Sequence, residues 1–467
     1  MSEPERRWAV VRPFPIRDFT SAPAQDRDQS RVGARIRHRV CGTHPRQDFC
    51  CMLRHVERSL SFNRACTVLM RLLFVIGNLG DYHVPRYEAL AKLADARGDK
   101  VCLVEVFGRS GAYGFPQEGR IAFFQGFPRD AVTLVEDAGE ADRHWWRVGI
   151  GLLAALRRCR PDVVVTLGYS TYYSLFLRLL KALGRRFTLI YMSDSKADDG
   201  RRYALKERLK KVLVSGFDGA LVAGEKHRAY AQSLGVPMSR SRIGFDVIDV
   251  EYFSAASRAA LENASTIRCY FGLPARYVIC VSRFIRRKNV ELLIEAFCQS
   301  QLHAAGLSLL LVGQGPCGPE IRNAIDRLGM SRYIQILGCV PCREMPALYS
   351  LAEFAVLPSA YDQWGLCISE AFAAAKPAIV TSTCGVANEL VLDGINGFIV
   401  RPGDAEALAD RLVRLATDDA LRERFSQNAV STVRGWTPTL FATNVIELTD
   451  SLTGAATSLV RSRGAAA

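Results

Sequence analysis

Short apolar runs alternate with amphipathic stretches from residue 70 onward, and this alternation dominates the pattern of the chain. Uninterrupted apolar runs are typical of parallel strands that are buried on both faces of a sheet. Such runs lie at 72–77, 101–106, 162–167, 187–192 and 219–223. Amphipathic stretches between them, such as Pro85 to Arg97 and Arg201 to Val214, are typical of the intervening helices.

The same pattern restarts after about residue 255. We expect strands at 277–282, 308–312, 333–337, 354–358, 377–382 and 397–400, with helices at 289–302, 319–329, 343–352 and 366–375. Strand–helix alternation in both parts predicts an α/β protein with two doubly wound, Rossmann-like domains facing a cleft. The expected domains are 70–255 and 256–435, followed by a helix and tail over 436–467. The junction, Asp249 to Ser265, is fairly polar and lacks strong periodicity.

Residues 1–69 differ from the rest of the chain because they lack apolar periodicity. Residues 1–70 contain 13 Arg, no Lys and 7 acids, which gives them a net charge of +6. One interpretation is a wrongly assigned start, with translation beginning at Met70. The other is a disordered basic tail that contacts RNA or lipid. No apolar segment followed by a small-residue cleavage site is present, so a secretory signal is disfavoured.

Composition narrows the class of protein. The chain has 467 residues, of which 49% are hydrophobic and 23% charged, as in globular proteins. No apolar run is long enough to span a membrane; the best candidate, 172–192, is interrupted by four basic residues. The net charge of +14 fits contact with phosphates or an anionic membrane, or a solvated surface without a special partner. The 14 cysteines are scattered, and Cys339 and Cys342 form one Cys-x-x-Cys without a second pair. We therefore expect no structural zinc site. The scattered cysteines favour a location in the reducing cytosol.

Candidate chemistry is densest at Tyr361–Ala371, where Asp362 and Glu370 lie eight residues apart with Trp364 and Gly365 between them. An apolar run precedes this segment and a helix rich in small residues follows it. The layout predicts a strand, a loop and a helix N-terminus. The free N–H groups and dipole of a helix N-terminus favour phosphate, and carboxylates accept hydrogen bonds from sugar hydroxyls.

This segment resembles the donor-site motif of the retaining GT-B glycosyltransferases of family 4, also called glycosyl transferases group 1. Their usual pattern is Glu, seven residues, Glu, whereas this chain has Asp362 at the first position. The resemblance is strongest over about 270–420 and weaker over 70–255. It implies a GT-B fold, a nucleotide diphosphate sugar as co-substrate and no other cofactor. It also implies transfer to an acceptor hydroxyl with retention of configuration and without a dedicated protein nucleophile. In that family the last helix crosses back onto the first domain, which the stretch Trp436 to Leu452 would do.

A basic loop follows the first strand of the second half. Arg283 offers a planar fork and Lys288 a point charge to a diphosphate, and both would neutralise the charge that grows on the leaving group. Their spacing matches the Arg and Lys of the family, which implies that they bind the diphosphate and act in catalysis. Arg286 and Arg287 have no such match, and we interpret them as solvent-exposed loop charges.

Other positions match the family motif more locally. Gly313 and Gly315 stand in a Gly-x-Gly-Pro turn of the nucleotide domain, and the backbone of Val340 would contact the base. Gly365 and Leu366 would present N–H groups to the sugar or phosphate, and Glu370 would hold the ribose hydroxyls. Asp362, which the resemblance implies is catalytic, would lie near the donor sugar, with a reach roughly 1.5 Å shorter than that of Glu. The turn at Asp393 to Gly397 is interpreted as architectural.

The first half supplies fewer candidates. Gly77 and Gly80 would permit close approach of the substrate, His83 is either catalytic or structural, and Asp194 either touches the acceptor or belongs to an ordinary turn. The helix at 203–213, basic on one side and apolar on another, either docks on anionic lipid or packs one face into the core.

The leading interpretation is therefore a metal-independent hexosyltransferase that uses a glycan or lipid-linked acceptor in polysaccharide, lipopolysaccharide or glycolipid biosynthesis, in the cytoplasm or peripherally on the membrane. A nucleotide-sugar epimerase of the same fold is one alternative. A catalytically weak sugar-nucleotide-binding subunit is another, motivated by Asp362. Nucleic-acid binding is disfavoured because the chain has no recognisable module and no aromatics interleaved with its basic residues.

Overall fold

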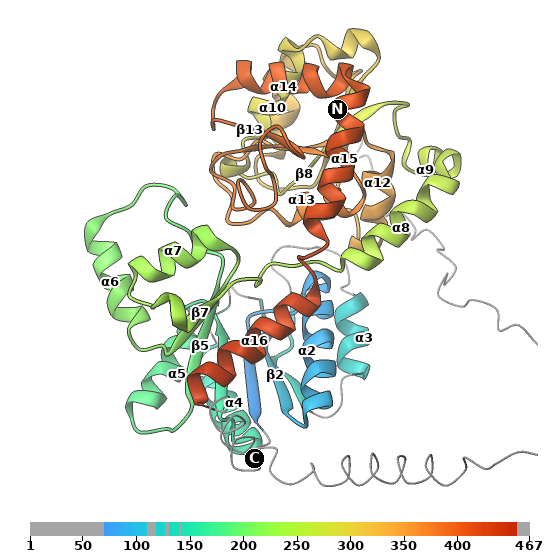
Figure 1. The fold of residues 1–467 in the computed structure, drawn as a ribbon. Helices are drawn as coiled ribbons and strands as arrows, with labels where there is room; N and C mark the ends of the chain where they lie inside the picture. Colours follow the sequence, from blue (N-terminus) through green and yellow to red (C-terminus); the bar gives the residue numbers. More distant parts are fainter. Residues whose placement is uncertain (1–69, 110–117, 127–129, 140–141, 143, 455–467) are drawn as a thin grey trace, which may run out of the picture. The chain divides into compact units, whose positions relative to one another are not determined.

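The computed structural model describes residues 70–109, 118–126, 130–139, 142 and 144–454 (Figure 1). All of them belong to one structural unit. The expected extension at 1–69, with the hypothesis of a start at Met70, and the tail after residue 454 lie outside the described residues.

In the described part of the N-terminal half, seven parallel strands form one sheet in the order β3-β2-β1-β4-β5-β6-β7. The strands are β1 (Arg71–Ile76), β2 (Lys100–Phe107), β3 (Ala131–Val135), β4 (Val163–Leu167), β5 (Thr188–Ser193), β6 (Gly219–Val222) and β7 (Ser241–Arg242). The central strands β1, β4, β5 and β6 are almost wholly buried, which explains their continuous apolar sequences.

Helices cover both faces of this first sheet. They are η2 (Asp81–His83), α2 (Val84–Arg97), α3 (Glu118–Gly126), α4 (Trp145–Cys159), α5 (Tyr172–Ala182), α6 (Ala204–Val214), α7 (Glu225–Ser233) and η3 (Met238–Arg240). The apolar side chains of α4, α5 and α7 share one core cluster, and those of α2 share the cluster on the other face.

The described C-terminal half contains a second parallel sheet of six strands in the order β10-β9-β8-β11-β12-β13. The strands are β8 (Tyr277–Val281), β9 (Ser308–Val312), β10 (Ile334–Leu337), β11 (Ala355–Leu357), β12 (Ala378–Thr381) and β13 (Gly397–Val400). The helices are α8 (Val250–Glu262), α9 (Ala264–Phe271), η4 (Arg286–Lys288), α10 (Val290–Gln299), η5 (Leu302–Ala305), α11 (Gly318–Arg327), η6 (Cys342–Glu344), α12 (Met345–Leu351), α13 (Leu366–Ala373), α14 (Ala405–Thr417) and α15 (Asp419–Val433). The two sheets with alternating helices confirm the expected α/β class.

The last helix, α16 (Pro438–Thr453), packs on the N-terminal half. Phe441 and Val445 join the core cluster of α2, and Arg97 of α2 pairs with Asp450 at 3.0 Å. Figure 1 shows α16 and α2 side by side.

The stretch Asp249 to Ser265 is not irregular. The Asp249 side chain accepts a hydrogen bond from the N–H of Tyr252 at 2.9 Å and thereby caps α8. Phe253 and Ala260 of this helix join a core cluster of the C-terminal half. The weak periodicity of this segment reflects the narrow apolar face that α8 buries, and the domain boundary near it stays a prediction.

Candidate functional site

A cavity of about 740 Å³ lies at the carboxyl ends of strands from both sheets. This is the edge at which open α/β sheets bind their ligands. The N-terminal half contributes Tyr82, His83, Leu167, Gly168, Tyr169, Ser170, Thr171, Tyr173, Met192, Ser193, Asp194, Ser195, Phe245 and Asp246. The C-terminal half contributes Val281, Ser282, Arg283, Arg287, Lys288, Val312, Gly313, Gln314, Cys339, Val340, Met345, Asp362, Gln363, Trp364, Gly365, Leu366, Cys367 and Glu370.

Three cations from the loop after β8 line the cavity. Arg283 is exposed, and Lys288 is largely buried. Arg287 was expected to be a solvent-exposed loop charge, and this is wrong: its side chain is largely buried, and its guanidinium lies over the Tyr361 ring at 5.5 Å and 3.8 Å from Asp362 Oδ1. Arg286 is exposed and is not among the lining residues. Sequence does not distinguish these neighbours, because the turn η4 determines which side chain faces the cavity.

Polar atoms beside these cations lack partners. Among the described residues, Ser282 Oγ and Arg287 Nη1 are buried without a hydrogen-bond partner. Burying unpaired donors costs free energy, on the order of 1–3 kcal/mol each. Both residues line the cavity, so an anionic ligand placed there would satisfy them.

Asp362 is 5% exposed and forms an ion pair with the ammonium of Lys288. Ser359 Oγ donates a further hydrogen bond to its Oδ2 at 3.4 Å. The two charges are 74 residues apart in sequence, so sequence reasoning placed both in the site without revealing that they pair. In this arrangement Asp362 positions the Lys288 ammonium beside the cavity.

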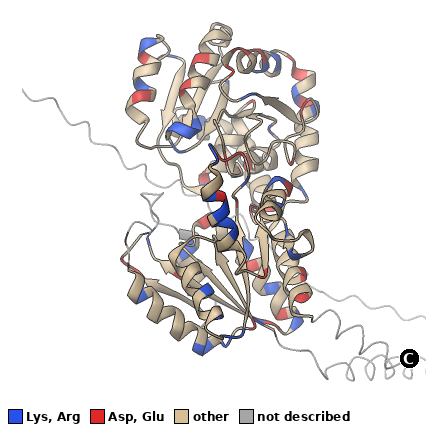
Figure 2. Ribbon diagram, turned by 90° about the vertical axis from the view of Figure 1, so that its left-hand side faces the viewer, with Lys and Arg blue, Asp and Glu red and all other residues tan. Residues whose placement is uncertain are grey.

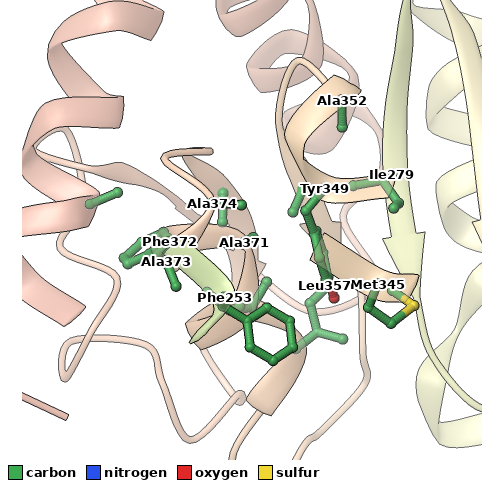
Figure 3. Packing of buried hydrophobic residues seen from close by; sticks show 14 of the residues in the cluster. Phe253, Ile279, Met345, Tyr349, Ala352, Leu357, Ala371, Phe372, Ala373 and Ala374 are labelled. Carbon is green, nitrogen blue, oxygen red and sulfur yellow. The ribbon is translucent and has the colours of Figure 1, made fainter. Parts of the chain in front are cut away.

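Glu370 lines the cavity and is 2% exposed. Its Oε2 accepts a hydrogen bond from the Tyr349 hydroxyl at 2.8 Å. Tyr349 lies among Ile279, Met345 and Leu357 in an apolar cluster (Figure 3). Burial raises the pKa of Glu370 to about 7, and hydrogen bonds from Tyr349 and Tyr82 act in the opposite direction. The carboxyl group is thus poised between its neutral and ionised forms near neutral pH.

Two glycines bring backbone close to the cavity. Gly365, the N-cap of α13, has φ 113°, and a Cβ there would lie 2.9 Å from Leu357 Cδ2. Gly313 has φ 144°, and a Cβ would lie 1.9 Å from the Ser282 carbonyl oxygen. Both positions therefore require glycine. At the start of α13 the Ile368 N–H donates to the Gly365 carbonyl oxygen at 2.9 Å, whereas the N–H of Leu366 has no acceptor within the helix.

Three predicted glycines do not line the cavity. Gly315 packs against the backbone of Phe284, where a Cβ would lie 2.4 Å from its carbonyl oxygen. Gly77 and Gly80 flank the turn that leads into η2, and Tyr82 and His83 reach the cavity from that segment instead. Val340, whose backbone was expected to contact the base, does line it.

The N-terminal half brings acidic groups to the cavity. Burial raises the pKa of Asp194 to about 6. Burial and the nearby Asp194 raise the pKa of Asp246 to about 7, with Arg86 acting in the opposite direction. Burial and the charge of Arg86 lower the pKa of His83 to about 3. Sequence reasoning missed Asp246, because it follows a two-residue strand that leaves almost no apolar signal.

The segment around Asp362 contacts the N-terminal half directly. Gln363 Nε2 donates to Asp194 Oδ1 at 3.1 Å, and the Gln363 carbonyl oxygen lies 2.7 Å from His227 Nε2. The Trp364 ring packs near His227, with 5.7 Å between ring centroids. A Cβ on Gly224 would lie 2.8 Å from Trp364, so glycine permits this close approach. His227 has no motif in the sequence that marks this role.

Comparison with known proteins agrees with this geometry. Residues 272–432 match the family model of glycosyl transferases group 1. The alpha-D-kanosaminyltransferase of Streptomyces kanamyceticus is 33% identical over 164 residues, which are 35% of this chain and 42% of that protein. The D-inositol 3-phosphate glycosyltransferase of Corynebacterium urealyticum is 28% identical over 213 residues, 44% of this chain and 49% of that protein. The chain thus spans less than half the length of both curated relatives.

Solved structures extend the likeness to both sheets. A glycosyltransferase from Rickettsia africae superposes with a TM-score of 0.64 at 15% identity, covering 82% of this chain and 98% of the other. Anabaena Alr3699/HepE, in complex with UDP and glucose, superposes with a TM-score of 0.63 at 17% identity, covering 82% and 100%. The fold is therefore GT-B, that of glycosyltransferases, as the sequence predicted.

Proposed function

We propose that this chain is a group 1 glycosyltransferase that moves a sugar from a nucleotide diphosphate sugar to an acceptor hydroxyl with retention of configuration. The observation that carries the proposal is the cationic side of the cavity. Arg283, Arg287 and Lys288 converge there with the N-terminus of α13. Cations and helix N–H groups together suit a diphosphate. The pathway that we propose is the assembly of a polysaccharide, lipopolysaccharide or glycolipid.

We assign residues of the cavity to each part of the nucleotide-sugar donor. Arg283 and Lys288 bind the diphosphate. Ser282 Oγ and Arg287 Nη1, which have no hydrogen-bond partner among the described residues, donate to phosphate oxygens. Glu370 accepts hydrogen bonds from ribose hydroxyls, and the strand ends at Gly313 and Val340 border the nucleoside. This assignment uses the buried donors that otherwise lack partners.

The chemistry requires neutralisation of the leaving group. The bond between the anomeric carbon and the β-phosphate oxygen breaks while the acceptor oxygen bonds to the same face of the sugar. The acceptor proton passes to a diphosphate oxygen. Lys288, held by Asp362, and Arg283 offset the charge that develops on the diphosphate. We therefore assign Asp362 a positioning function, and the proposed reaction needs no metal.

We also propose that the N-terminal half contacts an anionic membrane peripherally. Lys and Arg residues occur on helices of both halves (Figure 2), so charge alone singles out no surface. The helices α4, α5 and α6 combine charge with exposed apolar side chains. Their basic residues are Arg147, Arg157, Arg158, Arg178, Lys181, Lys206, Arg208, Lys210 and Lys211, against the one acid Glu207.

The apolar residues of this surface are exposed rather than packed. Trp145 is 70% exposed, Leu183 after α5 is 74% exposed and Leu205 of α6 is 79% exposed. In α6 Val214 is fully buried and Leu213 packs partly against the same core cluster, so the apolar face of this helix enters the core only in its last turn. Among the described residues, no helix is long and apolar enough to cross a membrane. Aromatic and basic side chains together are typical of interfacial binding.

Vesicle sedimentation tests the membrane proposal. Wild-type protein should sediment with phosphatidylglycerol vesicles and not with phosphatidylcholine vesicles, and the double variant Trp145→Ser, Trp146→Ser should lose most of this binding. Leu261→Ser, which changes an exposed apolar residue of α8, is the matched control. Equal sedimentation with both lipids, or retention of binding by the double variant, would refute the proposal.

A donor assay tests the transferase proposal. The protein is incubated with a panel of UDP-, GDP-, ADP- and dTDP-sugars, and release of the nucleoside diphosphate is measured with and without a mixture of oligosaccharide and lipid-linked acceptors. We expect one donor to be consumed, with mass spectrometry detecting the glycosylated acceptor. Isomerisation of the donor without transfer would contradict the proposal.

A further inference from the structure

The two sides of the cavity differ in charge, because cations among the described residues line only the C-terminal side, where Asp362 and Glu370 lie beside them. The cations that line it, Arg283, Arg287 and Lys288, all come from the loop after β8. Among the described lining residues of the N-terminal half, none is Lys or Arg, and this side holds the carboxyl groups of Asp194 and Asp246. The diphosphate therefore has a complementary side, and whatever binds opposite it meets acidic groups.

Asp194 directly follows β5, which ends at Ser193, and points its carboxylate to the junction of the two halves. Its Oδ1 accepts one hydrogen bond from the amide of Gln363, next to Asp362. A carboxylate can accept about four hydrogen bonds, so Asp194 keeps capacity for a ligand. The Gln363 contact fixes this carboxylate relative to the donor side.

The cation that pairs with Asp246, Arg86, is not accessible to a ligand in the cavity. Arg86 Nη1 lies 3.7 Å from Asp246 Oδ1, but the Arg86 side chain is 2% exposed and is not a lining residue. Its guanidinium lies 4.8 Å from the Phe245 ring centroid and donates to the Phe245 carbonyl oxygen. Arg86 therefore pairs with the Asp246 carboxylate from within the protein core and does not reach the cavity.

The remaining groups of this side are neutral. The imidazole of His83 is uncharged at physiological pH, since burial and Arg86 lower its pKa to about 3. The hydroxyls of Ser170, Thr171 and Ser195 and the ring of Tyr169 complete it. Hydroxyl groups, carboxylates and an aromatic ring are partners for sugar hydroxyls and sugar ring faces.

We infer that the acceptor end entering this cavity is a non-phosphorylated sugar, bound through hydroxyl or amino groups by Asp194 and Asp246, with amine-bearing sugars favoured over phosphorylated ones. This inference rests on the proposed function. A phosphate ester carries a charge of about −1.5 to −2 and would lie against carboxylates, on a side of the cavity that no described Lys or Arg lines. An ammonium group in the same place gains a charge-assisted hydrogen bond.

Saturation-transfer NMR provides the test because it detects weak binding. Glucosamine, glucose and glucose 6-phosphate are compared at equal concentration with the full-length protein, in the presence of UDP and, separately, of GDP. We expect glucosamine to give the strongest transfer and glucose 6-phosphate at most about one third of it. Glucose 6-phosphate binding as strongly as glucosamine, or no binding by any of the three sugars, would overturn the inference.

Variants identify the carboxylate responsible. Asp194→Asn should reduce the preference for glucosamine over glucose 6-phosphate at least about threefold, and Asp194→Glu should restore it. Asp137→Asn, which changes a carboxylate whose side chain is 94% exposed, is the control and should leave the ranking unchanged. An unchanged ranking in Asp194→Asn would refute the assignment, and the wild-type ranking tests the inference even if a variant fails to fold.

Failure of the acceptor inference can be distinguished from failure of the proposed function. Stabilisation of the protein by nucleoside diphosphates, measured by thermal shift, reports the donor site alone. If a nucleotide stabilises the protein and glucose 6-phosphate is the best-bound sugar, the inference fails and the donor site stands. If no nucleotide stabilises it, the proposed function fails whatever the sugar ranking.

Discussion

Replacing Glu370 by Gln should change how the stability of the protein depends on pH. Glu370 is 2% exposed, and its pKa is raised from 4.5 to about 7 by burial. The folded state therefore favours the neutral carboxyl. Gln has almost the same shape and can still accept the hydrogen bond from the Tyr349 hydroxyl, but it cannot ionise.

The sign and size of this change in stability with pH follow from the difference in the pKa of Glu370 between the folded and unfolded states. A group whose pKa is raised on folding stabilises the protein fully below its unfolded pKa, here 4.5, and this stabilisation is lost as the pH rises through about 7. Each pKa unit corresponds to about 1.4 kcal/mol. Between pH 5 and pH 8.5, wild type should therefore lose about 2–3 kcal/mol relative to Glu370→Gln. Asp194 and Asp246 also have raised pKa values, but both proteins contain them, so their effects cancel.

Urea denaturation at half-unit pH intervals, without nucleotide, measures this difference. The free energies of unfolding of wild type and Glu370→Gln should diverge as the pH rises, in favour of the variant. Glu406→Gln, a change at an exposed glutamate of α14, controls for loss of a charge. If the two curves run parallel from pH 5 to pH 8.5, Glu370 is not a buried neutral acid and the reasoning is refuted.

Three further predictions concern the donor side. Lys288→Met should cost about 1–3 kcal/mol in free energy of unfolding, because it removes the nearer of the two cations that pair with Asp362 and leaves only Arg287, at 3.8 Å. Adding Asp362→Asn should recover part of that loss, and strictly additive losses in urea denaturation would contradict the pairing. Gly365→Ala should cost about 1–3 kcal/mol in free energy of unfolding, because a Cβ at Gly365 would press against the Leu357 side chain. Gly272→Ala is the control and should cost less, because in the described part of the chain no atom beyond its chain neighbours lies within 4 Å of a Cβ at Gly272. Equal costs in the two variants would show that the contact with Leu357 is not strained. Sugar transfer should persist in excess EDTA, and its abolition, with recovery on adding back a divalent cation, would disprove metal independence.

Much of the fold was predictable because parallel strands buried on both faces carry an unmistakable apolar signal. The predicted runs at 308–312 and 397–400 coincide with β9 and β13. The edge strand β3, only partly buried, lacks such a run and was missed. The helix α4 was not among the expected helices, although Val148, Leu152, Ala155 and Leu156 form a regular buried stripe that the sequence carries.

The site was predictable only where a strand end carried a motif. Arg283, Lys288 and Glu370 follow or adjoin buried strands in a recognisable order, and all three line the cavity. Which of two neighbouring arginines faces a cavity depends on a turn, so Arg287 was misread. Asp246 lies at the cavity because of tertiary packing beside Arg86, and no local sequence pattern predicts that contact.

The central claim, a diphosphate site at the loop after β8, is tested most directly by calorimetric titration of nucleoside diphosphates into wild type, Arg283→Ala and Arg286→Ala. Both arginines are exposed cations of one loop, but only Arg283 lines the cavity. A charged hydrogen bond contributes about 1.5–3 kcal/mol, so Arg283→Ala should weaken binding about tenfold or more while Arg286→Ala leaves it nearly unchanged. Equal affinities for Arg283→Ala and Arg286→Ala, or no nucleotide binding by wild type, would contradict the account.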